Sequence, residues 1–274
     1  MNKISVIIQG PIIWDLTKPK GLPTTFYSIE QARKIIPNCE IILSTWEGEK
    51  TDLLNYDKII KSTDPGPQGK SKQNSIPNNV NRQITSTVAG LKAATYEFSL
   101  KIRSDTILTS NRFIEKFNRT PPPDAKWALF KQKIISNNLS SRNPRALPNT
   151  PLCFHPADHA HYGNTIDLLT LWDIPLQTEF DANFYIENPH PDGFRINETS
   201  RLTPEQHICT SAFKKKFEIN ISHYSDKCPD LLEQSEKLLL NNFLFLKDKD
   251  FSVRIDKYHT IEHQKYEWLR YPPN

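Results

Sequence analysis

Short apolar runs alternate with longer amphipathic segments in the first part of the chain. Residues 4–8 (ISVII) form a continuous β-branched run before Gly10, a pattern typical of a buried parallel strand. A helix is expected to begin near Thr24, and residues 40–46 (EIILSTW) and 57–61 predict two further strands. This order of elements is typical of the start of an α/β layered fold.

The same pattern continues beyond the first three strands. A helix is expected from Val80 to Ala94, followed by a strand at 98–103 whose polar end is Arg-Ser-Asp. The segment WALFK at 127–131 also predicts a strand. Two stretches that contain prolines and lack periodicity predict loops: 62–79 and 136–151.

The C-terminal part of the chain is predicted to be rich in helix. Residues 165–174 are amphipathic, and residues 203–217 have Pro204 near the expected helix start. We therefore expect an α/β domain with a central, mostly parallel sheet over residues 1–230. A helical or irregular C-terminal extension is expected over residues 231–274.

Composition excludes several classes of protein. Glycine is scarce, with 8 in 274 residues and no GxGxxG, which excludes a dinucleotide-binding oxidoreductase of the common type. The four cysteines are scattered without a CxxC pair, so neither a disulfide framework nor a zinc ribbon is indicated. No apolar run approaches the roughly 18–20 residues that span a bilayer. The N-terminal run lacks a signal-peptide cleavage site, so we expect a cytoplasmic protein.

The net charge of +4 conceals a polarised chain. Residues 1–150 carry 22 Lys and Arg against 12 Asp and Glu, whereas the remainder carries 13 against 19. A basic half attracts polyanions such as the phosphates of a small ligand, although a solvated basic surface is an equal alternative. Because the sequence has no RNA-binding motif, we expect no nucleic-acid partner.

Polar side chains follow the predicted strands at 9–11, 44–47 and 103–105. In open α/β sheets, ligands bind outside the carboxyl ends of the strands, so these side chains are expected to converge on one crevice. Asp105 stands at such a strand end. A carboxylate there can bind a divalent cation that bridges two phosphates, although a turn or cap residue is the commoner role.

A cluster of histidines follows Cys153 in the segment CFHPADHAHYG. Imidazole and carboxylate groups bind zinc, but the spacing of His155, Asp158, His159 and His161 matches no common zinc signature. If this segment is extended, His159 and His161 share a face and Asp158 points the other way. Three interpretations stay open: a zinc site, polar residues lining a substrate site, or ordinary surface.

Two predicted helix starts carry candidate chemistry. Glu205 lies in the first turn of its helix, where it either complements the helix dipole or acts as a general base. Asn81, Arg82 and Gln83 begin the helix that precedes the strand at 98–103. Exposed N–H groups and a cation at such a position can bind phosphate.

Five blocks of this sequence together resemble the WavE family of lipopolysaccharide-synthesis proteins. They are VIIQGPI, ILSTWEGE, NRQITSTVAGLKAA with LKIRSD, HPADHAHYG and RLTPEQ, in this order between about residues 4 and 225. The family is regarded as glycosyltransferase-like. The resemblance therefore implies a GT-A-like, Rossmann-type fold that binds a nucleotide sugar.

The resemblance also implies roles for individual residues. It makes Glu205 the catalytic base, gives Asp158 a catalytic role, and places His155, His159 and His161 on the acceptor side. Arg103 replaces the first Asp of the Asp-x-Asp found in GT-A enzymes. Either Asp105 alone binds Mg²⁺ or Mn²⁺, or Lys101 and Arg103 partly replace the ion as cations. The implied donor-site residues are Gln9, Gly10, Pro11, Ser44, Thr45, Trp46, Asn81, Arg82, Gln83, Lys101, Arg103 and Ser104.

The function implied is an inverting glycosyltransferase in lipopolysaccharide or surface polysaccharide synthesis. It would move a sugar from a nucleotide-activated donor to a hydroxyl group of a glycan or glycolipid. The alternatives are a zinc hydrolase centred on His155, His159 and His161, and a nucleotide-binding module without catalysis. The tail either packs on the domain or contacts the inner-membrane surface, through the aromatic residues Tyr258, Tyr266, Trp268 and Tyr271.

Overall fold

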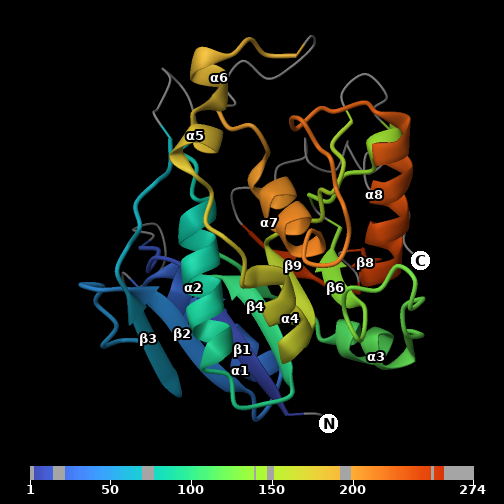
Figure 1. Cartoon of the computed structure of the whole chain (residues 1–274). Helices are drawn as coiled ribbons and strands as arrows, with labels where there is room; N and C mark the ends of the chain where they lie inside the picture. The colour runs from blue at the N-terminus through green and yellow to red at the C-terminus, as the bar shows by residue number, and fades with distance from the viewer. Residues whose placement is uncertain are drawn as a thin grey trace.

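The computed structural model describes residues 3–14, 22–69, 77–138, 140–146, 151–191, 199–247 and 250–255. Within these residues, seven strands form a sheet with the order β3-β2-β1-β4-β7-β6-β8 (Figure 1). They are β1 Ile4–Gln9, β2 Glu40–Trp46, β3 Lys58–Ser62, β4 Phe98–Arg103, β6 Ile134–Asn137, β7 Ala160–Asn164 and β8 Phe243–Leu246. A separate antiparallel pairing joins β5 Ile107–Leu108 to β9 Val253–Arg254.

The sheet is mostly parallel. Strand β1 pairs in parallel with β2 and β4, and β2 pairs in parallel with β3. Strand β7 is antiparallel to its neighbours β4 and β6, and β6 is parallel to β8. The predicted Rossmann-like α/β fold with a central, mostly parallel sheet is therefore confirmed.

Helices cover both faces of this sheet. The main ones are α1 Thr24–Ile35, α2 Val80–Lys92, α3 Arg112–Arg119, α4 Thr165–Trp172, α7 Pro204–Phe213 and α8 Pro229–Asn242. Short helices lie at α5 Glu179–Ala182, α6 Phe184–Glu187 and the 3-10 turn Pro144–Ala146. One apolar cluster joins the sheet to α1 and α3, and a second joins it to α2, α4, α7 and α8. No helix in the described part of the chain is long and apolar enough to cross a membrane.

Strand β4 shows how alternation sorts side chains between these two clusters. Leu100 and Ile102 point into the cluster that contains α1 and α3. Lys101 points to the opposite face, where Trp172 of α4 lies beneath its ammonium group. Helix α2 approaches this face closely at Gly90, because a Cβ atom there would lie 2.5 Å from Ile7 Cγ2.

The strand predicted at 127–131 is wrong. Three of its backbone N–H groups donate to side chains instead of a neighbouring strand: those of Leu129 and Phe130 to Asn242 Oδ1 at 2.6 and 3.3 Å, and that of Lys131 to Asp167. The strand of this region is β6, which begins at Ile134 and includes the first residues of the loop predicted at 136–151. Strand β7 was not predicted, because AHYGN lacks a clear alternation of apolar and polar residues.

The first part of the predicted C-terminal extension contributes to the main sheet. Residues 231–242 belong to α8, and β8 follows directly and pairs with β6. The division of the chain at residue 230 stays a prediction. The aromatic tail residues singled out from the sequence lie outside the described residues.

Candidate functional site

A crevice of about 530 Å³ lies at the carboxyl ends of β1, β2 and β4 and at the first turns of α2 and α7. It brings together polar groups from distant parts of the chain, as the strand-end pattern led us to expect. Twelve of the predicted site residues line it: Gln9, Gly10, Pro11, Trp46, Arg82, Gln83, Arg103, Ser104, Asp105, Asp158, His159 and Glu205.

Backbone contacts between neighbouring strand ends form the floor of this crevice. The N–H of Gly10 donates to the carbonyl of Ser44 at 3.0 Å, and that of Ser104 donates to Gln9 at 2.9 Å. Ser104 Oγ also donates to the carbonyl of Pro11 at 2.6 Å. Gly10 has a φ of +115°, and a Cβ atom there would lie 3.1 Å from Ser104 Oγ. Glycine is therefore required where β1 turns into the crevice.

Arg103 and Asp105 form a bidentate ion pair at the end of β4. Arg103 Nε donates to one carboxylate oxygen of Asp105 at 3.0 Å, and Nη2 donates to the other at 2.6 Å. Arg103 Nη1 lies 3.3 Å from His159 Nδ1. Both side chains of the ion pair are largely buried, which strengthens a charge-assisted bond of this geometry.

A second bidentate pair joins α2 to the loop after β3. Arg82 donates through Nε and Nη2 to the two oxygens of Asp64 at 2.7 and 2.6 Å. Its Nη1 donates to Asn79 Oδ1 at 3.0 Å. These contacts orient the Arg82 guanidinium at the start of α2, where Arg82 and Gln83 both line the crevice.

Glu205 lies in the first turn of α7, where a capping box determines the start of the helix. Thr203 and Gln206 exchange side-chain and backbone hydrogen bonds, and Pro204 occupies the first turn. The predicted helix start is thereby confirmed. Glu205 Oε2 lies 3.3 Å from Nε2 of the buried His155, while the carboxylate keeps access to the crevice.

Asp158 lines the crevice and is almost fully buried. Its Oδ1 lies 3.3 Å from His159 Nδ1. Burial by itself raises the pKa of Asp158, but the basic groups of His159, Lys101 and Arg103 lower it by more. The pKa therefore lies well below its usual range, and Asp158 is a weak proton acceptor.

Lys101 lies behind the crevice and does not line it. Its side chain is completely buried, with Nζ 4.2 Å from the ring centroid of Trp172. Nζ donates to the backbone carbonyl of Asp158 at 2.5 Å. Burial lowers the pKa of Lys101 to about 7. This lysine supports the segment before β7, and a contact with the donor would require it to leave its buried position.

Five further predicted site residues do not line the crevice either: Ser44, Thr45, Asn81, His155 and His161. Each is buried against protein groups instead. Asn81 exchanges two hydrogen bonds with the backbone of Gln177, and Ser44 donates to the carbonyl of Ser86. His161 accepts from Trp172 Nε1, so it faces the core and not an acceptor.

Six lining residues were not among the predicted site residues: Ile13, Glu49, Asp64, Pro77, Asn79 and Pro204. Glu49 and Asp64 follow the carboxyl ends of β2 and β3. The rule that ligands bind at strand ends would have found both, had it been applied to the loops as well as to the strands. Pro77 and Asn79 precede α2, and no local pattern distinguishes them.

The model of the WavE lipopolysaccharide synthesis family matches residues 4–270. The chain belongs to the WavE family. No curated protein matches it. Among solved structures, this WavE protein is similar to 4-diphosphocytidyl-2C-methyl-D-erythritol synthase from Anaerococcus prevotii, with 13% identity, a TM-score of 0.37, and coverage of 87% of this chain and 99% of that chain.

Two other solved structures are similar to this WavE protein at the same distant level. A cytidylyltransferase from Leptospira borgpetersenii is 12% identical with a TM-score of 0.38, covering 87% of this chain and 98% of its own. A CMP:2-keto-3-deoxy-manno-octonic acid synthetase complexed with CTP is 11% identical with a TM-score of 0.36, covering 66% and 81%. It is the family match that identifies the chain.

The residues at the end of β4 in this WavE protein do not fit a divalent cation on Asp105. Both of its carboxylate oxygens already accept from the Arg103 guanidinium, so a cation would meet a fixed positive charge. Among the described residues, no three His, Cys, Asp or Glu side chains are grouped as metal ligands.

The interpretation of the histidine cluster as a zinc site is wrong. His155 contacts Glu205, His159 contacts Asp158 and Ser140, and His161 contacts Trp172. The three imidazoles thus have separate partners and do not form one ligand set. An arrangement of this kind favours polar lining at His159 and structural contacts at the other two.

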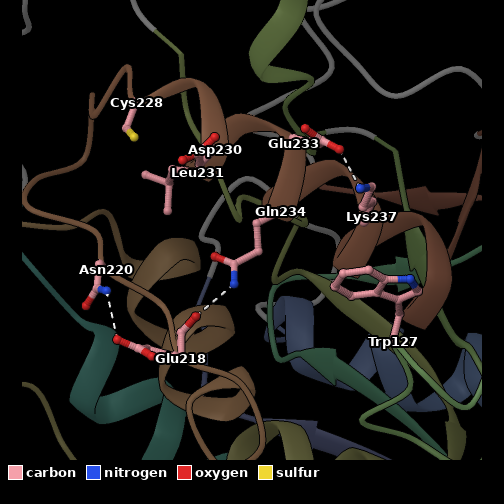
Figure 2. A pocket seen from close by; sticks show the side chains of 9 residues that line it. All are labelled: Trp127, Glu218, Asn220, Cys228, Asp230, Leu231, Glu233, Gln234 and Lys237. Atoms are coloured by element: carbon pink, nitrogen blue, oxygen red, sulfur yellow. Dashed lines mark hydrogen bonds and ion pairs between the residues drawn. The ribbon is translucent and has the colours of Figure 1, made fainter.

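A second cavity of about 550 Å³ lies at the start of α8 (Figure 2). Its lining residues are Trp127, Glu218, Asn220, Cys228, Asp230, Leu231, Glu233, Gln234 and Lys237. Gln234 donates to the Glu218 backbone, and Lys237 forms an ion pair with Glu233. None of the predicted site residues lies there, and its carboxylates outnumber its cation.

Proposed function

We propose that this WavE protein is a glycosyltransferase that transfers a sugar from a nucleotide-activated donor to a hydroxyl group during lipopolysaccharide synthesis. The observation that carries the proposal is the crevice at the sheet edge. It combines two oriented arginines, Arg82 and Arg103, with the accessible carboxylate of Glu205. Anion-binding groups and a general base in one crevice are what this transfer requires.

The donor is proposed to bind along the ends of β1, β2 and β4. Trp46 and the turn at Gly10 would line the nucleotide, and the arginines would contact its phosphates. Helix α2 begins at the same crevice, so the positive end of its dipole favours phosphate there. A planar guanidinium matches phosphate oxygens in a bidentate geometry.

Glu205 is proposed to act as the general base. It would take the proton from an acceptor hydroxyl while the acceptor oxygen forms a bond to the anomeric carbon. The bond from that carbon to the phosphate oxygen breaks, and its electron pair leaves with the nucleoside diphosphate. One displacement of this kind inverts the anomeric configuration. His155, 3.3 Å from Glu205, would orient the carboxylate.

Asp158 suits this role less well, although it lines the same crevice. A useful general base has a pKa near the working pH, and the pKa of Asp158 lies well below its usual range. Asp158 would instead orient neighbouring groups, and His159 beside it would face the acceptor. We propose a glycan or glycolipid acceptor and a reaction in the cytoplasm, at or near the inner membrane.

Thermal-shift assays with nucleoside diphosphates and nucleotide sugars test the donor site. At least one nucleotide is expected to raise the melting temperature. If no compound of the panel raises it at millimolar concentration, the proposal is wrong. With the best nucleotide sugar, Glu205→Gln is expected to lower the release of nucleoside diphosphate by about 100-fold or more.

The binding constant for the same donor should stay nearly unchanged in Glu205→Gln. Glu187→Gln, at an exposed position on α6, is the matched control and should behave like the unchanged protein. Full activity in Glu205→Gln would remove this residue from the mechanism. A nucleotide that binds and is never turned over would favour the non-catalytic module.

A further inference from the structure

Four of the five acidic side chains that line the crevice already contact basic side chains. Asp105 and Asp64 each accept two bonds from an arginine, with distances between 2.6 and 3.0 Å. Asp158 and Glu205 each lie 3.3 Å from a histidine nitrogen. At Arg82 and Arg103, the carboxylates therefore orient a cation as much as they supply negative charge to the site.

Of the two bidentate pairs, the one at the end of β4 is the more buried. Because side chains alternate along β4, Lys101 and Arg103 point to the same face of the sheet. Asp105 lies two residues after Arg103. The Arg103 guanidinium is also 3.3 Å from His159 Nδ1, so three contacts with two side chains determine its plane. A cation on Asp105 would have to break both bonds and lie next to the released guanidinium.

We propose that Asp105 is a positioning residue for Arg103 and not a metal ligand, and that Arg103 itself contacts the donor phosphates. This inference rests on the proposed donor site. Arg103 would stabilise the negative charge that the leaving diphosphate gains when its bond to the sugar breaks. Because arginine stays protonated at every working pH, it performs this task without a proton transfer.

Titration calorimetry with the best-binding nucleoside diphosphate tests the inference, in buffer with EDTA and with excess Mg²⁺ or Mn²⁺. Arg103→Ala is expected to weaken binding about tenfold or more, the loss of a charge-assisted phosphate contact. Asp105→Asn is expected to weaken binding about threefold to tenfold, because the Arg103 guanidinium loses the carboxylate that orients it. The double variant should bind no worse than Arg103→Ala, because the two residues act through one contact.

Each variant's fold-change in dissociation constant, relative to the unchanged protein, should be the same with EDTA and with the cations. Arg103→Lys, which keeps the charge and loses the fork, serves as a second variant should Arg103→Ala fail to fold. Asp57→Asn is the matched control, since Asp57 pairs with Arg33 outside the crevice. It should bind as the unchanged protein does.

A different result would overturn the inference and leave the donor site intact. If Mg²⁺ or Mn²⁺ tightens binding tenfold or more and Asp105→Asn abolishes that gain, Asp105 is a metal ligand. Additive losses in the double variant would equally refute the positioning role. If no nucleoside diphosphate binds under either condition, the proposed donor site fails and the inference falls with it.

Discussion

Replacing Lys101 with methionine removes a completely buried ammonium group from the sheet face that carries α2 and α4. Burial lowers the pKa of Lys101 from 10.5 to about 7, so the unfolded chain binds this proton more tightly than the native chain. Below pH 7 the native state must keep a buried charge, and the contribution of Lys101 to the free energy of unfolding is at its lowest. As the pH rises toward 10.5, the proton is already absent from the native state, and stability increases.

The size of the effect follows from the same pKa. A proton bound only in the unfolded state changes the free energy of unfolding by up to about 1.4 kcal/mol per pH unit. Over the interval from about 7 to 10.5, the difference between the two proteins should change by a few kcal/mol, on the order of 4. Asp158 stays ionised throughout this interval because its pKa lies well below its usual range.

Urea unfolding followed by circular dichroism, repeated between about pH 7 and pH 9.5, measures this difference. The unchanged protein should gain stability relative to Lys101→Met as the pH rises. Lys116→Met, at an exposed position on α3, is the control and should show no such trend. If the difference in free energy of unfolding between Lys101→Met and the unchanged protein does not depend on pH, then burial does not lower the pKa of Lys101.

Three further changes test packing and electrostatics elsewhere. Gly90→Ala should lower the melting temperature by several degrees, because its Cβ atom would lie 2.5 Å from Ile7 Cγ2, and an unchanged value would contradict this packing. Asn242→Ala should cost about 2–3 kcal/mol in urea unfolding, since buried and partly buried backbone groups of residues 127–130 lose their partners. Burial raises the pKa of Glu40, but hydrogen bonds, the one from Lys58 foremost, lower it further, to about 2. Glu40 therefore stabilises the fold above pH 4.5. Glu40→Gln should therefore reduce the loss of stability as the pH falls from 4.5 to 2.

Strands β1, β2 and β4 were predictable because their signal is local. ISVII, EIILSTW and FSLKIR are short apolar or β-branched runs that end at polar residues. Helix α7 was predictable for a similar reason, since TPEQ places a proline and a carboxylate in the first turn. Such patterns need no knowledge of what lies across the sheet.

The failed strand at 127–131 shows the opposite case. WALFK has the composition of a strand, but its N–H groups meet Asn242 and Asp167, which are far away in the sequence. The histidine segment is similar. The side on which His155, His159 and His161 find partners depends on β7 lying between β4 and β6, and no local pattern predicts that placement.

The sequence by itself determined the alternation of strands and helices, the polar strand ends, and a basic half rich in candidate phosphate ligands. Periodicity and helix-start chemistry carry that information within a few residues. Only the tertiary structure decided that Lys101 is buried behind the crevice and that Arg103 pairs with Asp105 inside it. Burial and ion pairing depend on which elements lie side by side, and β7 brings Asp158 and His159 to the end of β4.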